Sequence, residues 1–166
     1  MVKIDLITGF LGSGKTTFLK KYAKRLMEQE QCELEMISGG CDPETHRRRF
    51  RTKLIAMGMC GYDRVLVEPS GIYDMDEFFD VLHEEPLDRW YEIGNVIAVV
   101  DARLEDALSP EAEYLLASQA ANAGCMILSK CDTATEEQRR NTIAHLKRSL
   151  TALGCKQRAD HKVLCE

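Results

Sequence analysis

The sequence has no long hydrophobic run. Its apolar stretches are short, such as residues 96–100, whereas a membrane-spanning helix needs roughly 20 predominantly apolar residues. The first residues place Asp5 where a signal peptide would have its apolar core, so they predict a strand and no signal peptide. We therefore expect no association with a membrane.

The chain also lacks an excess of positive charge and any pair of cysteines spaced as CxxC. It has 22 Lys and Arg against 27 Asp and Glu, a net charge of −5, which argues against a general nucleic-acid binder. The seven cysteines are odd in number and irregularly spaced, so we expect reduced thiols in a cytoplasmic protein. Hydrophobic residues make up 45% of the chain, enough for a folded core.

Short β-rich runs alternate with helical patterns along the chain. The predicted strands are residues 2–8, 33–37, 64–67, 96–101, 126–129 and 162–165. The predicted helices are residues 15–29, 43–57, 76–83, 110–123 and 135–153. This alternation predicts an α/β fold with a mostly parallel central sheet and helices on both faces. Because no repeat or linker is present, we expect residues 1–166 to form a single domain.

The strongest motif is TGFLGSGKTT at residues 8–17. It matches G-x-x-x-x-G-K-[ST] through Gly9, Gly14, Lys15 and Thr16, between a predicted strand and a predicted helix. Its glycines allow backbone N–H groups to turn toward phosphate oxygens. Lys15 would reach the β- and γ-phosphates, and the Thr16 hydroxyl would bind Mg²⁺. The motif predicts a nucleotide-binding phosphate loop.

A strand that ends in an acid follows, within VLVEPSG at residues 65–71. A parallel sheet places Glu68 at its carboxyl edge, where ligands bind. There Glu68 could orient an attacking water or support Mg²⁺ through a water, and the N–H of Gly71 could sense the γ-phosphate. The alternative is an acid that is simply solvated at a strand end.

A third motif, SKCD at residues 129–132, approximates the guanine-specificity motif N-K-x-D. The Asp132 carboxylate can accept both N1–H and N2–H₂ of guanine, and the Lys130 stem can lie along the base. Ser129 replaces the usual Asn, which removes an amide that normally ties this loop to the phosphate loop. The alternative for the motif is a helix N-cap turn. A separate candidate is Asp101, at the end of another predicted strand. It either positions another residue of the site or caps a turn.

Together these segments resemble the CobW/HypB/UreG family of P-loop GTPases, most closely its CobW branch. The resemblance is carried by TGFLGSGKTTFLKKY, YDRVLVEPSGIYD, NVIAVVDARL and SQAANAGCMILSKCD. The resemblance implies a P-loop NTPase fold and Mg²⁺-dependent hydrolysis of GTP. Members of the family use this reaction to deliver metals or cobalt cofactors to client enzymes. The residues expected to bind nucleotide are Gly9, Gly12, Ser13, Gly14, Lys15, Thr16, Thr17, Lys130 and Asp132, with Glu68 and Gly71 in the second switch.

The chain departs from the family pattern in two places. Of the family metal motif G-C-x-C-C it keeps only Cys41, because Asp42 and Pro43 follow. We therefore expect only weak binding of Zn²⁺ or another transition metal at Cys41, and the favoured interpretation of Cys41 is a small loop residue. Residues 31–37 are too few to contain the family's first switch. Either the switch is deleted in this protein, or a loop is missing from the sequence. We also expect this chain to lack the family's C-terminal domain.

The sequence predicts a slow GTPase that a client protein or a second subunit completes. Its expected partners are GTP and GDP, a client metalloenzyme or cofactor-dependent enzyme, and a nucleotide-dependent second copy of the chain. Two other functions remain open at this stage. One is a non-hydrolysing, nucleotide-gated docking or metal-delivery module. The other is an ATP-dependent P-loop enzyme such as a small-molecule kinase.

Overall fold

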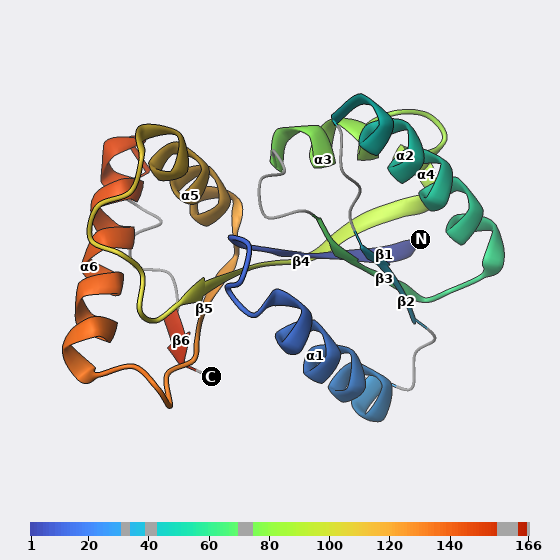
Figure 1. Cartoon of the computed structure of the whole chain (residues 1–166). Coiled ribbons are helices and arrows are strands. Elements are labelled where there is room, and N and C mark those ends of the chain that lie inside the picture. The colour runs from blue at the N-terminus through green and yellow to red at the C-terminus, as the bar shows by residue number, and fades with distance from the viewer. Residues whose placement is uncertain (31–33, 39–42, 70–74, 156–162, 166) are drawn as a thin grey trace.

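A six-stranded parallel sheet forms the centre of the molecule (Figure 1). The computed structural model describes residues 1–30, 34–38, 43–69, 75–155 and 163–165. In sheet order the strands are β2 (Leu34–Ser38), β3 (Arg64–Glu68), β1 (Val2–Thr8), β4 (Tyr91–Asp101), β5 (Cys125–Ser129) and β6 (Val163–Cys165). The helices are α1 (Lys15–Glu30), α2 (Pro43–Cys60), α3 (Met75–Leu82), α4 (Leu87–Trp90), α5 (Pro110–Asn122) and α6 (Glu136–Ala152).

The two faces of the sheet carry separate hydrophobic clusters, because successive strand residues point to opposite faces. On one face Ile7 of β1 packs with Leu19 and Leu26 of α1. On the other face Ile4 and Leu6 belong to a larger cluster to which α2, α3, α5 and α6 contribute. In Figure 1, α1 accordingly lies below the sheet while α2, α3 and α4 lie above it. The predicted α/β fold with helices on both faces is confirmed.

The structure differs from the predicted elements mainly around α4 and β4. Strand β4 begins at Tyr91, five residues before the predicted start, and the short helix α4 was not predicted. The added segment carries Glu92, Gly94 and Asn95 in exposed positions, so it shows no apolar run. Its pairing with β1 is irregular, with a register shift between Ile4 and Leu6.

A buried ion pair explains why this polar segment joins the sheet. Arg64 donates to both carboxylate oxygens of Asp5 at 2.8 Å, and Tyr22 donates to Asp5 at 2.7 Å. The backbone N–H of Asn95 donates to the same carboxylate at 2.7 Å. A Cβ at Gly94 would lie 2.1 Å from Asp5 Oδ1, so only glycine fits beside this carboxylate. Because an unpaired buried charge is costly, these contacts fix the beginning of β4 against β1.

The last long helix begins as its sequence predicts. Thr135 caps α6 by accepting a bond from the Gln138 N–H, and the Gln138 side chain accepts a bond from the Thr135 N–H. This capping box fixes the path of the chain from β5 into α6. Among the residues that the structure describes, no helix is both long and apolar enough to cross a membrane.

Candidate nucleotide-binding site

The carboxyl ends of β1, β3, β4 and β5 lie at one edge of the sheet. All four strands run parallel, so their carboxyl ends share this edge. The phosphate loop follows β1, Glu68 ends β3, Asp101 ends β4, and Lys130 follows β5. The structure therefore brings together three motifs that are far apart in the sequence.

The phosphate loop turns tightly from β1 into α1. Gly9 has a φ of +141°, and a Cβ there would lie 2.1 Å from the carbonyl oxygen of Val99. This position therefore requires glycine for both its backbone conformation and the close approach of β4. The N–H of Ser13 donates to the carbonyl of Phe10 at 3.1 Å, which closes the turn. Helix α1 begins at Lys15, so its N-terminus faces the interior of the loop, where an anion is favoured.

Lys15, the first residue of α1, is directed back at the loop and is 6% exposed. Its Nζ donates to the carbonyls of Gly9 and Phe10, both at 2.8 Å. Burial lowers the pKa of Lys15, while the charge of Glu68 opposes this shift. An ammonium has three N–H donors, so these two bonds leave one donor for a phosphate oxygen. A bound polyphosphate would also offset the effect of burial on the charged form.

Thr16 and Glu68 meet directly. The Thr16 hydroxyl donates to Glu68 Oε1 at 2.6 Å, joining the first turn of α1 to the end of β3. Both are oxygen ligands of the kind that Mg²⁺ prefers, beside a loop suited to phosphates, so their chemistry fits a magnesium site. Thr17 is exposed on the same turn. Gly71 lies outside the described residues.

Ser129 ties the loop after β5 to the phosphate loop. Its hydroxyl donates to the carbonyl of Ser13 at 2.5 Å and lies 3.3 Å from the carbonyl of Val100. Because Ser129 replaces the usual Asn, the sequence predicted the loss of the bond between this loop and the phosphate loop. The structure shows that the smaller Ser129 hydroxyl forms such a bond, because the two loops lie close enough together. Ser129 is 4% exposed, so this bond lies in the protein interior.

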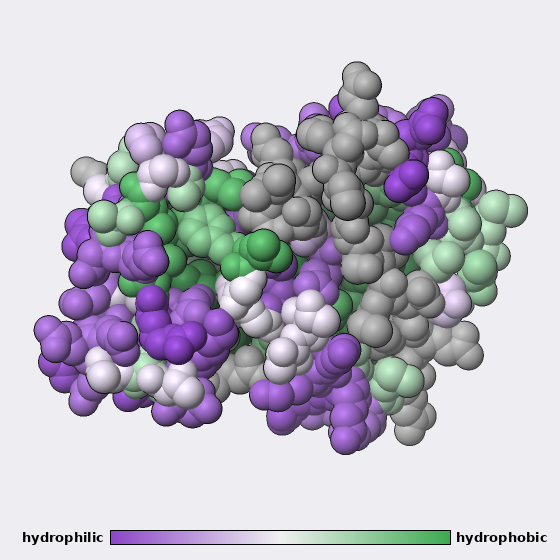
Figure 2. Space-filling view, viewed as in Figure 1, coloured by the Kyte–Doolittle hydropathy of each residue, from purple (hydrophilic) through white to green (hydrophobic). Residues whose placement is uncertain are grey.

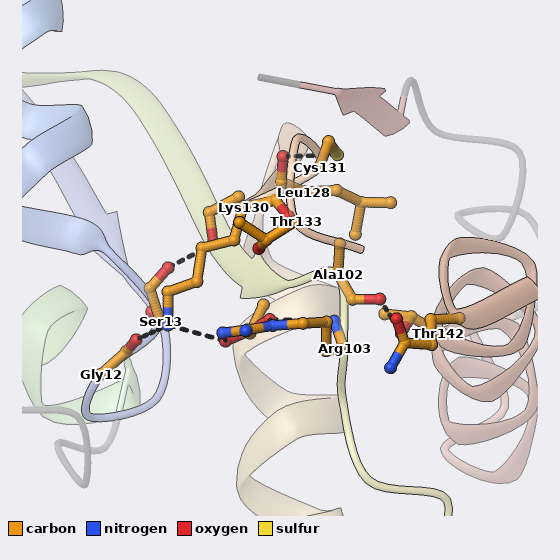
Figure 3. Close-up of polar contacts among 12 residues, drawn as sticks. Gly12, Ser13, Ala102, Arg103, Leu128, Lys130, Cys131, Thr133 and Thr142 are labelled. Carbon is orange, nitrogen blue, oxygen red and sulfur yellow. Dashed lines mark hydrogen bonds and ion pairs between the residues drawn. The ribbon is translucent and has the colours of Figure 1, made fainter. Parts of the chain in front are cut away.

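Lys130 forms a second connection between the two loops (Figure 3). It has a φ of +58°, and its Nζ donates to the carbonyl of Gly12 and to Asp101 Oδ2, both at 2.7 Å. Its own carbonyl accepts bonds from the backbone of Thr133 and Ala134, which turn the chain toward α6. Asp132 is exposed in this turn. The loop thus leaves the Asp132 carboxylate accessible to solvent.

Asp101 and Arg103 also belong to the site, although the sequence pattern left two roles open for Asp101 and did not point to Arg103. Arg103 donates to Asp101 through its backbone N–H at 2.9 Å and through its guanidinium at 3.2 Å. Burial would raise the pKa of Asp101, but the bonds from Arg103 and Lys130 outweigh it and lower this pKa to about 2. Asp101 is therefore ionised at neutral pH. An acid at the end of a parallel strand was the available sequence signal.

A cavity of about 270 Å³ lies beside the phosphate loop, between it and α5. Val99, Val100 and Leu116 line it together with Phe10 and Leu11 of the loop. Figure 2 shows hydrophobic surface in this region of the view, between the phosphate loop and α5. The Leu11 side chain at the loop tip is 90% exposed, so the edge of the site is partly apolar.

The candidate transition-metal ligand Cys41 lies outside the described residues. Among the side chains that the structure does describe, no three His, Cys, Asp or Glu residues gather as a metal site. Weak transition-metal binding therefore stays a prediction.

The parallel sheet, the glycine-rich loop and the acid at the end of β3 define a P-loop nucleotide-binding protein of the α/β class. The chain belongs to the CobW/HypB/UreG family, whose nucleotide-binding domain matches residues 23–155. The match begins within α1, after the phosphate loop, which is identified by its own motif and geometry.

Three known proteins illustrate this relationship. The zinc chaperone YeiR of Escherichia coli K12 is 26% identical over 160 residues, covering 82% of this chain and 49% of YeiR. A Zn(II)-bound triple mutant of the GTPase YjiA is 21% identical, with a TM-score of 0.63 over 99% of this chain and 57% of YjiA. The hydrogenase maturation factor HypB of Archaeoglobus fulgidus is 16% identical, with a TM-score of 0.58 over 99% of this chain and 80% of HypB. The chain thus spans about half the length of YeiR.

Proposed function

We propose that this protein binds GTP and hydrolyses it with Mg²⁺, and that the GTP cycle assists delivery of a metal or metallocofactor to a client protein. The observation that carries the proposal is the 2.6 Å bond between Thr16 and Glu68. It joins a phosphate-loop hydroxyl, which can bind Mg²⁺ directly, to a strand-end carboxylate, which can support Mg²⁺ through a water.

The phosphate loop binds the triphosphate in this proposal. Backbone N–H groups of Gly12 and Gly14, on either side of Ser13, surround the β-phosphate, while Lys15 faces the β- and γ-phosphates and donates its remaining N–H to one of their oxygens. Thr16 holds Mg²⁺ directly, and Thr17 contacts the α-phosphate from the next position. When bound, Mg²⁺ neutralises charge that develops on the phosphate oxygens.

Glu68 and Gly71 act at the γ-phosphate. Glu68 accepts a hydrogen bond from the attacking water, or from a water on Mg²⁺, and thereby orients it. The N–H of Gly71 reports the presence of the γ-phosphate. Phosphoryl transfer needs positioning and charge stabilisation more than covalent help, so these few groups suffice for slow hydrolysis.

Guanine recognition is assigned to the loop after β5. Asp132 accepts the two guanine donors, and the stem of Lys130 packs on the base. Adenine offers no such pair of donors, so this loop favours GTP over ATP. The bonds from Ser129 and Lys130 to the phosphate loop support the assignment, because they set the base site at a fixed position relative to the phosphates.

Metal delivery is supported by family membership and by the relative YeiR, which is described as a zinc chaperone. We expect zinc to be a weakly held cargo, with Cys41 as its one ligand from the family motif. Zinc titration against a competing chelator tests this, with Cys41→Ser compared with Cys60→Ser, whose thiol is exposed on α2. A stoichiometric site tighter than micromolar that only Cys41→Ser removes would contradict the expectation of weak binding and strengthen the chaperone role.

Single-turnover phosphate release tests hydrolysis itself. Protein in excess over GTP and Mg²⁺ should release one phosphate per GTP, slowly and above the rate without protein. Binding of GTP with no such release would favour the alternative function, a nucleotide-gated docking or delivery module that does not hydrolyse.

A further inference from the structure

A continuous series of contacts links the loop after β4 to the phosphate loop. Asp101, at the end of β4, accepts a bond from Lys130 Nζ at 2.7 Å. The same Nζ donates to the carbonyl of Gly12 at 2.7 Å. Lys130 therefore bridges a carboxylate on one loop and a carbonyl on another, and Figure 3 shows its side chain reaching toward Gly12.

We propose that Asp101 is a positioning residue for nucleotide binding, which holds Lys130 against the phosphate loop so that the base and phosphate sites keep one relative position. Asp101 does not contact the nucleotide in this account and acts through Lys130. The inference rests on the proposed function, because it assumes that the loop after β5 receives the base.

Asp101 itself is held firmly. The N–H of Ala102 donates to the carbonyl of Ser129 at 3.0 Å, and the Thr142 hydroxyl of α6 donates to the carbonyl of Ala102 at 2.9 Å. Thr142 is 1% exposed, so the second of these bonds is buried. Ala102 is thus bonded to both β5 and α6. These bonds hold the backbone beside Asp101 in place and so fix the position of its carboxylate.

The Asp101–Lys130 contact is partly exposed, so its own share of the stability that the Asp101 contacts provide is small. The side chains of Asp101 and Lys130 are 23% and 37% exposed. Ion pairs near the surface contribute little to folding, because their attraction is screened and ordering the side chains costs entropy. Lys130, in contrast, has a long flexible stem that loses its fixed direction without the carboxylate. The contact is therefore best explained by preorganisation, in which the stem is already in place before the base arrives.

A cap on the turn after β4 is the competing explanation, since Asp101 also accepts the Arg103 N–H at 2.9 Å. Asp101→Asn separates the two roles. The amide oxygen still accepts the Arg103 N–H, whereas the neutral amide no longer attracts the Lys130 ammonium. A variant that keeps the cap but loses the charge isolates the positioning role.

The test is a double-mutant cycle of Asp101→Asn and Lys130→Met, read by calorimetric binding of GTP and of tripolyphosphate, which has no base. Asp101→Asn should weaken GTP binding about tenfold, equivalent to about 1.4 kcal/mol. It should weaken tripolyphosphate binding less. In the Lys130→Met background it should have almost no further effect, because the partner through which it acts is gone. Glu28→Gln, which removes the carboxylate of an exposed ion pair on α1, is the charge-matched control.

Two results would overturn the inference while leaving the proposed function intact. One is GTP affinity in Asp101→Asn equal to that of the unmodified protein. The other is losses that simply add in the double variant. If the unmodified protein binds GTP no better than ATP, the proposed function itself fails. Should Asp101→Asn fail to fold, Asp101→Glu keeps the charge but displaces the carboxylate by one methylene, and the same cycle with Lys130→Met applies.

Discussion

The Thr16 hydroxyl donates to Glu68 Oε1 at 2.6 Å, across 52 positions of the sequence. This bond exists because β1 and β3 are neighbours in a parallel sheet, with Leu6 opposite Val67. The phosphate loop and the strand-end acid therefore emerge side by side. Neither motif alone specifies a hydrolytic site, but together they place a hydroxyl suited to binding Mg²⁺ next to a carboxylate suited to orienting water.

Glu68→Gln separates binding from chemistry. The glutamine amide oxygen can still accept the Thr16 hydroxyl, so the local geometry should persist. The negative charge that orients water and supports Mg²⁺ is lost. We expect GTP affinity within a few-fold of the unmodified protein and a much slower single-turnover rate of phosphate release. The control is Glu92→Gln, on an exposed position of β4. Equal rates in both variants would reduce Glu68 to a structural residue.

Lys15→Ala removes the main cation that faces the β- and γ-phosphates in the proposed site. Affinity for GTP should fall at least tenfold, about 1.4 kcal/mol, while circular dichroism shows an intact fold. Lys20→Ala, on the exposed face of the same helix, should bind GTP as the unmodified protein does. Unchanged affinity in Lys15→Ala would remove the basis for assigning residues 9–17 to phosphate binding.

Asp132→Asn tests recognition of the base. An amide at this position cannot accept both guanine donors, but it can donate to the 2-oxo group of xanthine. Affinity should therefore shift from GTP toward xanthosine triphosphate in competition binding. The exposed Asp88→Asn on α4 supplies a control with the same chemical change. A variant that retains full preference for GTP would exclude Asp132 from the base site.

The Asp101 contacts predict a pH dependence of stability. The bonds from Arg103 and Lys130 lower the pKa of Asp101 to about 2 against a usual 3.8, despite the opposing effect of burial. A lowered carboxyl pKa stabilises the fold above the unfolded-state pKa, and this contribution is lost as the pH falls through the folded-state value.

The free energy of unfolding should therefore differ between the unmodified protein and Asp101→Asn by a constant amount from about pH 5 to 8. The difference should shrink between about pH 4 and 2. Urea unfolding at each pH measures it. A difference that grows on acidification would show that Asp101 is not held as an anion.

Much of the fold could be predicted because its strands and helices have strong local patterns. The apolar runs that became β1, β4 and β5 are buried in a parallel sheet, and α6 begins at its predicted position, after the capping box at Thr135. The polar beginning of β4 could not be predicted in this way. It joins the sheet through the bond from Asn95 to Asp5, a contact between residues 90 positions apart.

In the candidate site, too, some features follow from local sequence patterns and others depend on long-range contacts. Its motifs lie at strand ends that the parallel arrangement brings together, so their proximity follows from the sequence pattern. The connection through Lys130 depends instead on a backbone φ of +58° and on β4 and β5 being neighbours. Likewise, the Ser129 bond to Ser13 depends on how closely two loops approach, and no local motif encodes that distance.

Comparison of GTP and ATP binding to the unmodified protein with Mg²⁺ tests the central claim most directly. Calorimetric titration of both nucleotides under identical conditions gives the two affinities, and excess tripolyphosphate as competitor shows whether both occupy the phosphate loop. The account predicts one site that prefers GTP by at least tenfold, because Asp132 pairs with donors that adenine lacks. Equal affinity for ATP, or a preference for it, would contradict the account and favour an ATP-dependent P-loop enzyme.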